Sequence, residues 1–340
     1  MRKTVLLLFG GESSEHDVSI MSARNVYAAM DDDKYTVELC YIDRNGKWWL
    51  LETWQENLHE HGGEQLAPVP GSGSFLTLPG MRPLRIDVIF PVLHGENGHE
   101  DGAVQSLANL MHIPVIGCGV GASAVCWDKL YTKQLLAGND IAVVPYVVHR
   151  ASDEMPRYQD IAAKLGGTLF VKPTIAGSSI GVSKVHHEAE FQPALELALE
   201  HSSQVLIEKA VEGRELEVAV LGNPPHHKES GVGEILPGKE FYDYEDKYAA
   251  DSKAQVITNA EMTDELREKI RHVAHQAYEV LGCRGLARVD FLVDDDEIYV
   301  NELNTLPGFT NISQYPKLWA EQGISYGSLI DQLVELAFEK

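Results

Sequence analysis

Two short segments near the carboxyl end carry the residues most able to do chemistry. The first contains Arg288 and Asp290, and the second contains Glu302 and Asn304. Both lie in stretches of alternating character, GLARVDFLV and EIYVNELN, which predict two β-strands joined by an acidic turn. Two carboxylates and an amide oxygen beside a guanidinium suit the binding of magnesium ions on a polyphosphate. The alternative is a solvated strand face with one surface salt bridge.

The pairing of these two strands decides which side chains meet. If residues 294–296 form a three-residue loop, Arg288 lies opposite Glu302. Asp290 is then diagonal to Glu302, and Asn304 follows on the same face. The other face carries apolar side chains fit for burial, namely Ala287, Val289, Phe291, Val293, Tyr299 and Leu303. Burial of that face favours a structured metal site over a solvated strand.

Composition restricts the class of protein. A chain of 340 residues with 44% apolar and 23% charged residues predicts a globular protein of two or three domains. The net charge of −23 argues against nucleic acid or an anionic membrane surface as a partner. The apolar start TVLLLF is too short to span a bilayer, and glycines and acidic residues end it without a cleavage site, so we expect a buried first strand. The four cysteines show no CxxC spacing, which favours the cytoplasm.

The order of strand and helix patterns divides the chain into three expected parts. Residues 1–120 predict an open α/β unit, residues 121–211 a central unit, and residues 212–340 a carboxyl-terminal unit. Within these parts we expect a glycine- and proline-rich loop at 62–83, one continuous helix at 122–137, a helix at 263–281, and a carboxyl-terminal helix from about Ser325.

A nucleotide site is indicated without a dinucleotide fingerprint or a P-loop, neither of which occurs. The loop GSSIG at 177–181 could present N–H groups and hydroxyls to phosphate oxygens, although it could also be an ordinary turn. Lys172 closes the apolar strand before it, which supports the phosphate interpretation, and Lys129 gives weaker support. The strand end at 208–211 could pair with an adenine edge and Glu215 with ribose, or both could be solvated.

The motifs together resemble those of D-alanine:D-alanine ligases of the ATP-grasp superfamily. The resemblance covers nearly the whole chain, in family order. It is carried by FGGESSEHDVS, LHG…EDG, WDKL, VKPTIAGSSIG, LIEKAVEGRE, YDYEDKY, ARVD and NELNTLPGFTNISQYP. It implies an α/β (α+β) three-domain ATP-grasp fold. The part at 1–120 would hold the first D-alanine, the part at 121–211 would be the central subdomain, and the part at 212–340 would carry the lid loop and the metal site.

The resemblance also implies a role for each matching residue. The ATP-binding residues would be Lys129, Lys172 and Ser179 at the phosphates, Glu208, Lys209 and Val211 at adenine, and Glu215 at ribose. The metal ligands would be Asp290, Glu302 and Asn304. The residues for substrate and catalysis would be Glu15 and His94 at the first D-alanine, Arg288 and the Gly308 N–H at the oxyanion, Ser313 at the second substrate, and Ser178 and Tyr248 in a triad with Glu15 that closes a loop carrying Lys247.

The implied reaction is ATP-dependent joining of two D-alanines through a D-alanyl phosphate, for peptidoglycan. Joining two amino acids needs an activated carboxylate and a lid that excludes water. The aromatic-rich residues 241–255 suit such a lid, and the alternative is an ordinary surface loop. The cofactors would be ATP and two Mg²⁺ ions, with Mn²⁺ as a substitute, and the protein would be a cytoplasmic homodimer. The alternatives are a ligase that takes D-lactate or D-serine second, and a catalytically silent nucleotide-binding protein. One departure from the family pattern is the extra residue in HGENGHEDG, which leaves open where Glu100 lies relative to His94.

Overall fold

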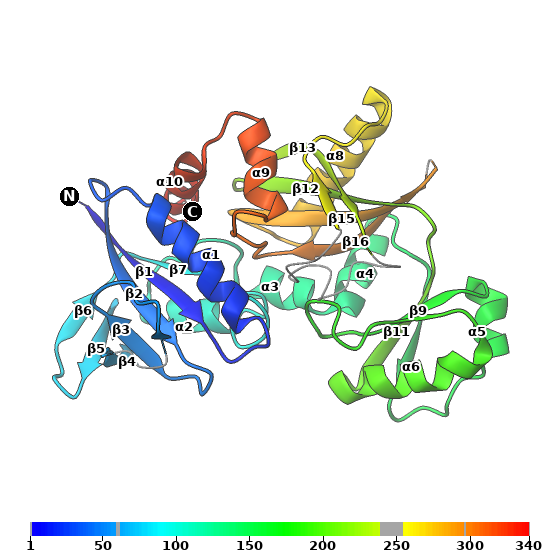
Figure 1. The fold of residues 1–340 in the computed structure, drawn as a ribbon, viewed down its shortest axis with the longest axis horizontal. Coiled ribbons are helices and arrows are strands. Elements are labelled where there is room, and N and C mark those ends of the chain that lie inside the picture. Colours follow the sequence, from blue (N-terminus) through cyan, green and yellow to red (C-terminus); the bar gives the residue numbers. More distant parts are fainter. Residues whose placement is uncertain (1, 59–61, 239–253, 296, 340) are drawn as a thin grey trace.

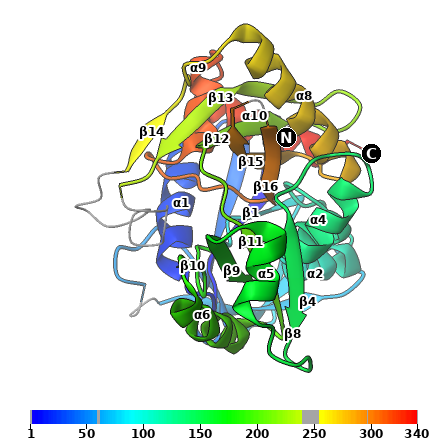
Figure 2. The same ribbon diagram turned by 90° about the vertical axis from the view of Figure 1, so that its right-hand side faces the viewer.

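Three β-sheets, each with helices packed against it, form the chain (Figure 1). The computed structural model describes residues 2–58, 62–238, 254–295 and 297–339. The amino-terminal sheet lies at one end of the molecule, the central sheet at the other, and the carboxyl-terminal sheet between and above them (Figures 1 and 2). Among the described helices, none has the length and apolar character needed to cross a bilayer.

The amino-terminal sheet has the strand order β6-β5-β4-β3-β2-β1-β7, with β1 parallel to both of its neighbours. The continuous apolar run of β1 is typical of a parallel strand covered on both faces, and its residues 5–9 are fully buried. The elements are β1 (Lys3–Gly10), α1 (His16–Ala29), β2 (Tyr35–Ile42), β3 (Trp48–Leu51), β4 (Glu64–Val69), β5 (Ser74–Leu78), β6 (Pro83–Arg85), β7 (Val88–Pro91) and α2 (Ala103–Met111).

The predicted loop at 62–83 is wrong, because this segment forms the antiparallel strands β4, β5 and β6. Its glycines and prolines mark the turns between short strands. Leu66 and Phe75 point inward and are buried in the core beneath the sheet. These strands are only three to six residues long, so the alternation of apolar and polar residues in each is too short to be recognised between the turns.

The central sheet is antiparallel, in the order β10-β9-β11-β8, and α5 and α6 pack against it. Its core includes Val171 and Ile207 from the strands and Phe191 from α6. This sheet places Lys172 and Glu208 on adjacent strands. The elements are β8 (Tyr146–Arg150), α5 (Tyr158–Leu165), β9 (Leu169–Pro173), β10 (Ser183–Val185), α6 (Glu188–His201) and β11 (Gln204–Lys209).

The carboxyl-terminal sheet has the order β14-β13-β12-β15-β16, and α8 packs against it. The predicted helix at 263–281 is present as α8, which Thr263 caps by accepting a hydrogen bond from the Leu266 N–H. The elements are β12 (Arg214–Leu221), β13 (Lys228–Leu236), β14 (Gln255–Ile257), α8 (Asp264–Val280), β15 (Leu286–Asp294) and β16 (Glu297–Asn304).

The predicted continuous helix at 122–137 is two helices, α3 (Val120–Trp127) and α4 (Lys129–Ala137). Asp128 separates them, because its backbone is extended and its side chain accepts from the N–H groups of Leu130 and Tyr131. That N-cap starts a new helix in a new direction. Cys126 and Leu136 belong to the core of the carboxyl-terminal sheet, so both helices link that core to the central segment.

The carboxyl-terminal end of the chain returns to the amino-terminal sheet. The last helices are α9 (Gln314–Glu321) and α10 (Tyr326–Leu336). Ser325 caps α10, which begins where the sequence predicted. Trp319 and Leu333 lie in one core with Val5 and Phe9 of β1, and Figure 1 shows α10 close to α1. This shared core holds the carboxyl-terminal helices against the amino-terminal sheet.

Candidate active site

A cavity of about 810 Å³ opens where the three sheets meet. Elements of all three parts of the chain contribute to its lining. It is lined by all of the described residues for which the sequence predicted a role: Glu15, His94, Lys129, Lys172, Ser178, Ser179, Glu208, Lys209, Val211, Glu215, Arg288, Asp290, Glu302, Asn304, Gly308 and Ser313. The remaining two, Lys247 and Tyr248, and most of the predicted lid lie outside the described residues.

The polar face of the β15–β16 hairpin faces this cavity, but its register differs from the prediction. Asp290 pairs directly with Glu302, and Arg288 with Asn304. The turn is one residue shorter than expected, because Asp294 pairs with Glu297. A bulge then shifts the pairing again between Asp290 and Phe291. The two shifts together move the register by two residues. Because side chains alternate with a period of two, the predicted polar side chains still share one face.

The same shifts change the apolar face near the turn. Phe291 pairs with Val300, which is fully buried, whereas Tyr299 lies opposite Leu292 on the polar side. The prediction that Tyr299 joins the buried face is therefore wrong. Its hydroxyl instead donates to the Glu297 carboxylate at 2.6 Å.

Arg288 is held by two acidic side chains. Its Nε and Nη2 donate to the two Asp290 oxygens, both at 2.6 Å, and Nε lies 3.2 Å from Glu217 Oε1. Burial favours the neutral form, but Asp290 and Glu217 outweigh it and raise the Arg288 pKa well above its usual value. Nη1 has no hydrogen-bond partner among the described residues, so it can still donate to a substrate. Glu217 was not predicted, although RELEVAVL places Glu215 and Glu217 on one strand face.

The three predicted metal ligands lie together on the hairpin. Asp290 and Glu302 are paired across the ladder, and Asn304 is two residues further along the same strand. The Asn304 side-chain oxygen accepts from the Leu306 N–H at 2.9 Å, which holds its orientation. Carboxylate and amide oxygens are the ligands that Mg²⁺ prefers, so this donor set fits that ion.

Lys129 and the serine loop adjoin these ligands. Lys129 Nζ donates to the Ala176 carbonyl at 2.6 Å and lies 3.8 Å from Glu302. In the loop, Ser178 and Ser179 both have left-handed backbones, with φ of 50° and 60°. Such strain in consecutive residues requires support from its surroundings. A Cβ at Gly177 would lie 2.9 Å from Glu15 Oε2, so a larger residue there would displace this carboxylate.

Two lysines, of which Lys133 is buried and Lys172 partly exposed, enclose the buried Glu208. Lys172 lies 2.7 Å from one Glu208 oxygen, and Lys133 lies 3.0 Å from the other. Burial alone would raise the Glu208 pKa, but the two ammonium groups hold it below its usual range. Burial lowers the pKa of Lys133 in spite of Glu208. Lys133 was not predicted, although its position between Leu130 and Leu136 on the apolar face of the helix pattern was a signal.

Removing one of the two lysines around Glu208 is expected to have a large effect on stability. Lys133→Met should lower the free energy of unfolding by about 3 kcal/mol, because it leaves a buried carboxylate with one of its two cations. The double variant Lys133→Met/Glu208→Gln should cost less than the single one, since the buried charge is gone. Chemical denaturation measures both, with the exposed Lys164→Met as a control. Equal stability of Lys133→Met and the control would contradict the prediction.

Glu15 and His94 form the wall nearest the amino-terminal sheet. The Ser178 hydroxyl donates to Glu15 Oε1 at 2.5 Å, which links the serine loop to the first part of the chain. His94 Nδ1 lies 3.2 Å from the Leu306 carbonyl and 3.6 Å from Glu100 Oε1. The extra residue in HGENGHEDG therefore leaves Glu100 in reach of His94.

Charge coupling in this wall favours a protonated imidazole. Burial lowers the His94 pKa, but Glu100 and then Glu15 outweigh burial and raise it. Burial raises the Glu100 pKa, and the nearby Glu15 charge adds to that rise. The result is a buried group of alternating acidic and basic side chains beside the serine loop.

Gly308 and Ser313 lie together at the other wall. A Cβ on Gly308 would lie 2.6 Å from Ser313 Oγ, so a larger residue there would displace the Ser313 hydroxyl. Ser313 Oγ also accepts from the Thr310 N–H at 3.0 Å and lies 2.8 Å from the Thr310 hydroxyl. The remaining predicted nucleotide residues, Lys209, Val211 and Glu215, line the cavity between the end of β11 and the start of β12.

Comparison with known proteins agrees with this geometry. The family described as "D-ala D-ala ligase N-terminus" matches residues 4–118, and "D-ala D-ala ligase C-terminus" matches residues 135–335. A D-alanine–D-alanine ligase A of Chromobacterium violaceum is 46% identical, over 98% of this chain and 94% of that protein. The ligase A of Escherichia coli K12 is 41% identical, over 98% and 95%.

Solved structures show the same architecture. The D-alanine–D-alanine ligase of Coxiella burnetii superposes with a TM-score of 0.89 at 34% identity, over 99% of this chain and 94% of that one. The VanG D-Ala:D-Ser ligase of Enterococcus faecalis superposes with a TM-score of 0.90 at 33% identity, over 99% and 100%. The predicted ATP-grasp fold is confirmed, and the chain belongs to the D-alanine–D-alanine ligase family.

Proposed function

We propose that the protein joins two D-alanines to D-alanyl-D-alanine at the expense of ATP, for peptidoglycan synthesis. One observation carries the proposal. A single cavity brings together lysines for phosphate, a magnesium-type donor set, the Arg288 guanidinium and the Glu15 carboxylate. A protein that only bound nucleotide would need neither Arg288 nor Glu15 there.

The chemistry explains why these groups belong together. A carboxylate is a poor electrophile at neutral pH, so it must first take the γ-phosphoryl group of ATP and become an acyl phosphate. The amine of the second D-alanine then attacks the carbonyl carbon, and phosphate leaves as the amide forms. Both steps develop negative charge, which prearranged cations and N–H donors stabilise.

The described residues divide this work by position. Lys129 and Lys172, with the N–H groups of the serine loop, neutralise and orient the phosphates. Glu208, Lys209 and Val211 bind adenine at the end of β11, and Glu215 binds ribose. Glu15, beside His94, holds the ammonium of the first D-alanine. Arg288, through Nη1, and the Gly308 N–H stabilise the oxyanion, and Ser313 binds the carboxylate of the second substrate.

Asp290, Glu302 and Asn304 are the residues that would hold magnesium. Two bound Mg²⁺ ions, for which Mn²⁺ can substitute, would supply positive charge at the β- and γ-phosphates. The direct pairing of Asp290 with Glu302 supports the assignment, because it places both carboxylates at one point of the cavity wall. Lys129 beside Glu302 connects that point to the serine loop.

Tyr248, Ser178 and Glu15 complete the proposal as a triad that closes a lid carrying Lys247. The bond from Ser178 to Glu15 supports it, since two members already meet. Tyr248→Phe should remove the tie to Ser178 and admit D-lactate, most visibly at lower pH, where the competing amine is protonated. Ser178→Ala should act in the same direction. Competition between D-alanine and D-lactate at several pH values measures this, and unchanged product ratios in both variants would argue against the triad.

The function itself is tested by acceptor choice. Phosphate release should be rapid with D-alanine alone, and low with L-alanine. In competition at pH 7.5, D-alanyl-D-alanine should exceed both D-alanyl-D-lactate and D-alanyl-D-serine. A larger yield of either of these two products would change the assigned second substrate but keep the ligase assignment. ATP binding without phosphate release under any of these conditions would favour the silent nucleotide-binding alternative.

Three further properties belong to the same proposal. We place the domain limits at 1–120, 121–211 and 212–340, which agrees with the distribution of strands among the three sheets. We expect a cytoplasmic enzyme, because ATP is available there and the four cysteines are unpaired and buried. We expect a homodimer, which sedimentation would establish.

A further inference from the structure

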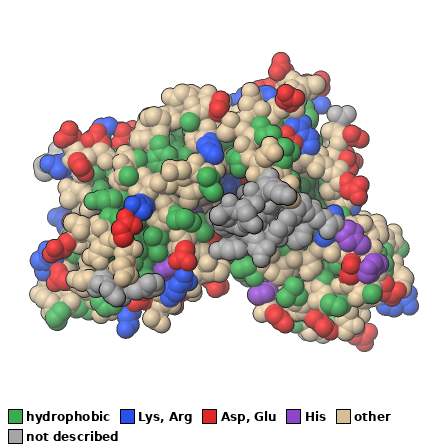
Figure 3. Space-filling view, viewed as in Figure 1, with side chains coloured by type: hydrophobic (Ala, Val, Ile, Leu, Met, Phe, Trp, Pro, Cys, Tyr) green, Lys and Arg blue, Asp and Glu red, His purple; other side chains and the backbone are tan. Residues whose placement is uncertain are grey.

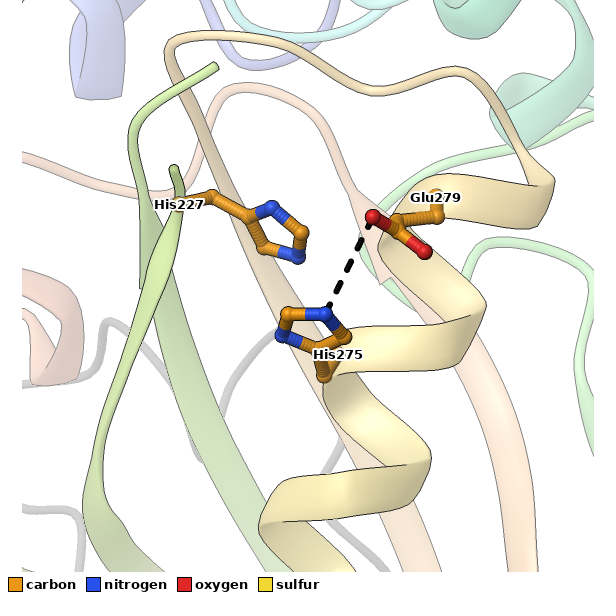
Figure 4. Close-up of side chains that lie close together, drawn as sticks. All are labelled: His227, His275 and Glu279. Atoms are coloured by element: carbon orange, nitrogen blue, oxygen red, sulfur yellow. Dashed lines mark ion pairs between the residues drawn. The ribbon is translucent and has the colours of Figure 1, made fainter. Parts of the chain in front are cut away.

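Two histidines and a glutamate lie together outside the cavity, between the β12–β13 turn and α8 (Figure 4). His227 immediately precedes β13, and His275 and Glu279 are one turn apart on α8. One ligand atom from each residue lies within 4.8 Å of the other two. Figure 4 shows the His227 ring beside the His275 ring, with the Glu279 carboxylate close to both and paired with His275.

His227 has an unusual environment. Its side chain is 7% exposed, and neither ring nitrogen has a hydrogen-bond partner among the described residues. The ring stacks on His275, with centroids 4.0 Å apart, and on Tyr278, with centroids 5.0 Å apart. Buried polar atoms in native proteins normally have partners, and an unsatisfied one costs free energy. A ligand between the ring and α8 would satisfy this imidazole.

His275 is oriented by a carboxylate on its far side. Its Nδ1 lies 2.6 Å from Glu229 Oε1, and its Nε2 faces Glu279 at 3.8 Å. Arg271 in turn lies 3.9 Å from Glu229 and holds it in place. A carboxylate that accepts from one imidazole nitrogen leaves the other free to bind, and histidine ligands of metals have this arrangement.

We propose that His227, His275 and Glu279 bind a divalent transition-metal ion of the zinc type. Two imidazoles and one carboxylate are a common donor set for Zn²⁺, with water as the fourth ligand, whereas Mg²⁺ prefers oxygen alone. Tetrahedral bonds of about 2.0–2.1 Å place the ligand atoms about 3.3 Å apart. In the cluster these atoms lie within 4.8 Å of one another, so binding an ion requires the exposed Glu279 side chain to rotate and the stacked imidazoles to turn toward it.

This site is separate from the catalytic one. β13 runs from Lys228, beside His227, to Leu236, which lines the cavity. A strand of this length spans on the order of 26 Å, at about 3.3 Å per residue. The ion would therefore join the β12–β13 turn to α8 and stabilise the carboxyl-terminal unit, and it would not touch the substrates.

Zinc titration of the full-length protein against a chromogenic chelator tests the proposal. Wild type should bind one more equivalent of Zn²⁺ than His275→Ala. Glu279→Gln should weaken that equivalent at least about 10-fold, and Glu229→Gln about 10- to 100-fold through His275. His272→Ala is the matched control, because it removes an exposed histidine from the same helix outside the cluster. Zinc bound at the catalytic carboxylates contributes equally in every variant and cancels.

Two further measurements make the test decisive. X-ray absorption of the zinc-loaded wild type should show imidazole nitrogen ligands, which His275→Ala should lose. Thermal unfolding without zinc shows that each variant is folded, and added zinc should raise the melting temperature of wild type and of His272→Ala but not that of His275→Ala. Equal zinc stoichiometry and affinity in wild type and His275→Ala, or a shell of oxygen ligands only, would overturn the proposal.

Discussion

Replacing Glu302 with glutamine is expected to lower turnover roughly 100- to 1,000-fold while the protein stays folded. The change keeps size and shape but removes a charged oxygen from the point where Asp290 and Asn304 also face the cavity. Weaker metal binding then leaves the developing phosphoryl charge without compensation. Steady-state phosphate release over a range of magnesium concentrations measures the loss, and high magnesium should restore part of it.

The same hairpin supplies a matched control for this experiment. Glu297 lies near the turn, is exposed, and does not line the cavity. Glu297→Gln therefore makes the same chemical change in the same element and should leave turnover unchanged. Wild-type turnover of Glu302→Gln at ordinary magnesium would remove Glu302 from the metal site. Equal losses in the two variants would indicate a general effect on the hairpin.

Replacing Arg288 with alanine is expected to abolish dipeptide formation, a loss of at least about 100-fold, while ATP still binds. The guanidinium is assigned to the reacting oxyanion, and adenine is bound elsewhere, at the end of β11. Arg288→Lys should recover little activity. The guanidinium makes two hydrogen bonds to Asp290 and keeps Nη1 for the oxyanion, and a single ammonium nitrogen cannot reproduce both contacts. Calorimetric ATP titration and dipeptide assay on the same preparations separate binding from catalysis.

The control for this prediction must distinguish catalysis from folding. Arg288→Ala leaves Asp290 and Glu217 without their shared cation, so its unfolding curve must accompany the kinetics. Arg284 lies just before the same strand, and its guanidinium contacts Asn223 and the Glu339 carbonyl but does not line the cavity. Arg284→Ala should therefore keep full activity. Equal loss of nucleotide affinity and turnover in Arg288→Ala would show that the guanidinium is misassigned.

Charge at the surface is consistent with a small-molecule enzyme. On the face shown in Figure 3, acidic and basic side chains are interspersed, with apolar side chains between them. The net charge of −23 does not prevent the binding of ATP, because Lys129 and Lys172 place positive charge at the cavity. Both lysines are largely shielded from solvent, which strengthens their effect on a phosphate at short range.

The sequence alone determined the types of group in the active site and many of the elements that carry them. Alternation in LARVDFLV and EIYVNELN predicted the hairpin, and the apolar run TVLLLF predicted a buried first strand. Motifs in family order then predicted the ATP-grasp fold and the cavity residues. The strands could be predicted because each depends on neighbours within a few residues, such as the strand period of two, whereas the fold and the cavity residues were implied by the resemblance to a known family.

Tertiary structure decided the features that depend on distant parts of the chain. The hairpin register depended on a bulge whose position is set by packing, with Val300 buried and Tyr299 on the polar side. The break at Asp128 placed α3 and α4 in the core of the carboxyl-terminal sheet.

The same holds for the charged groups that were not predicted. Lys133 and Glu208 are 75 residues apart, and no local pattern marks them as an ion pair. His227 and His275 are stacked only because β13 packs against α8. Contacts of this kind arise when whole elements pack together, since the partner of each side chain is then chosen by the fold and not by its neighbours in the sequence.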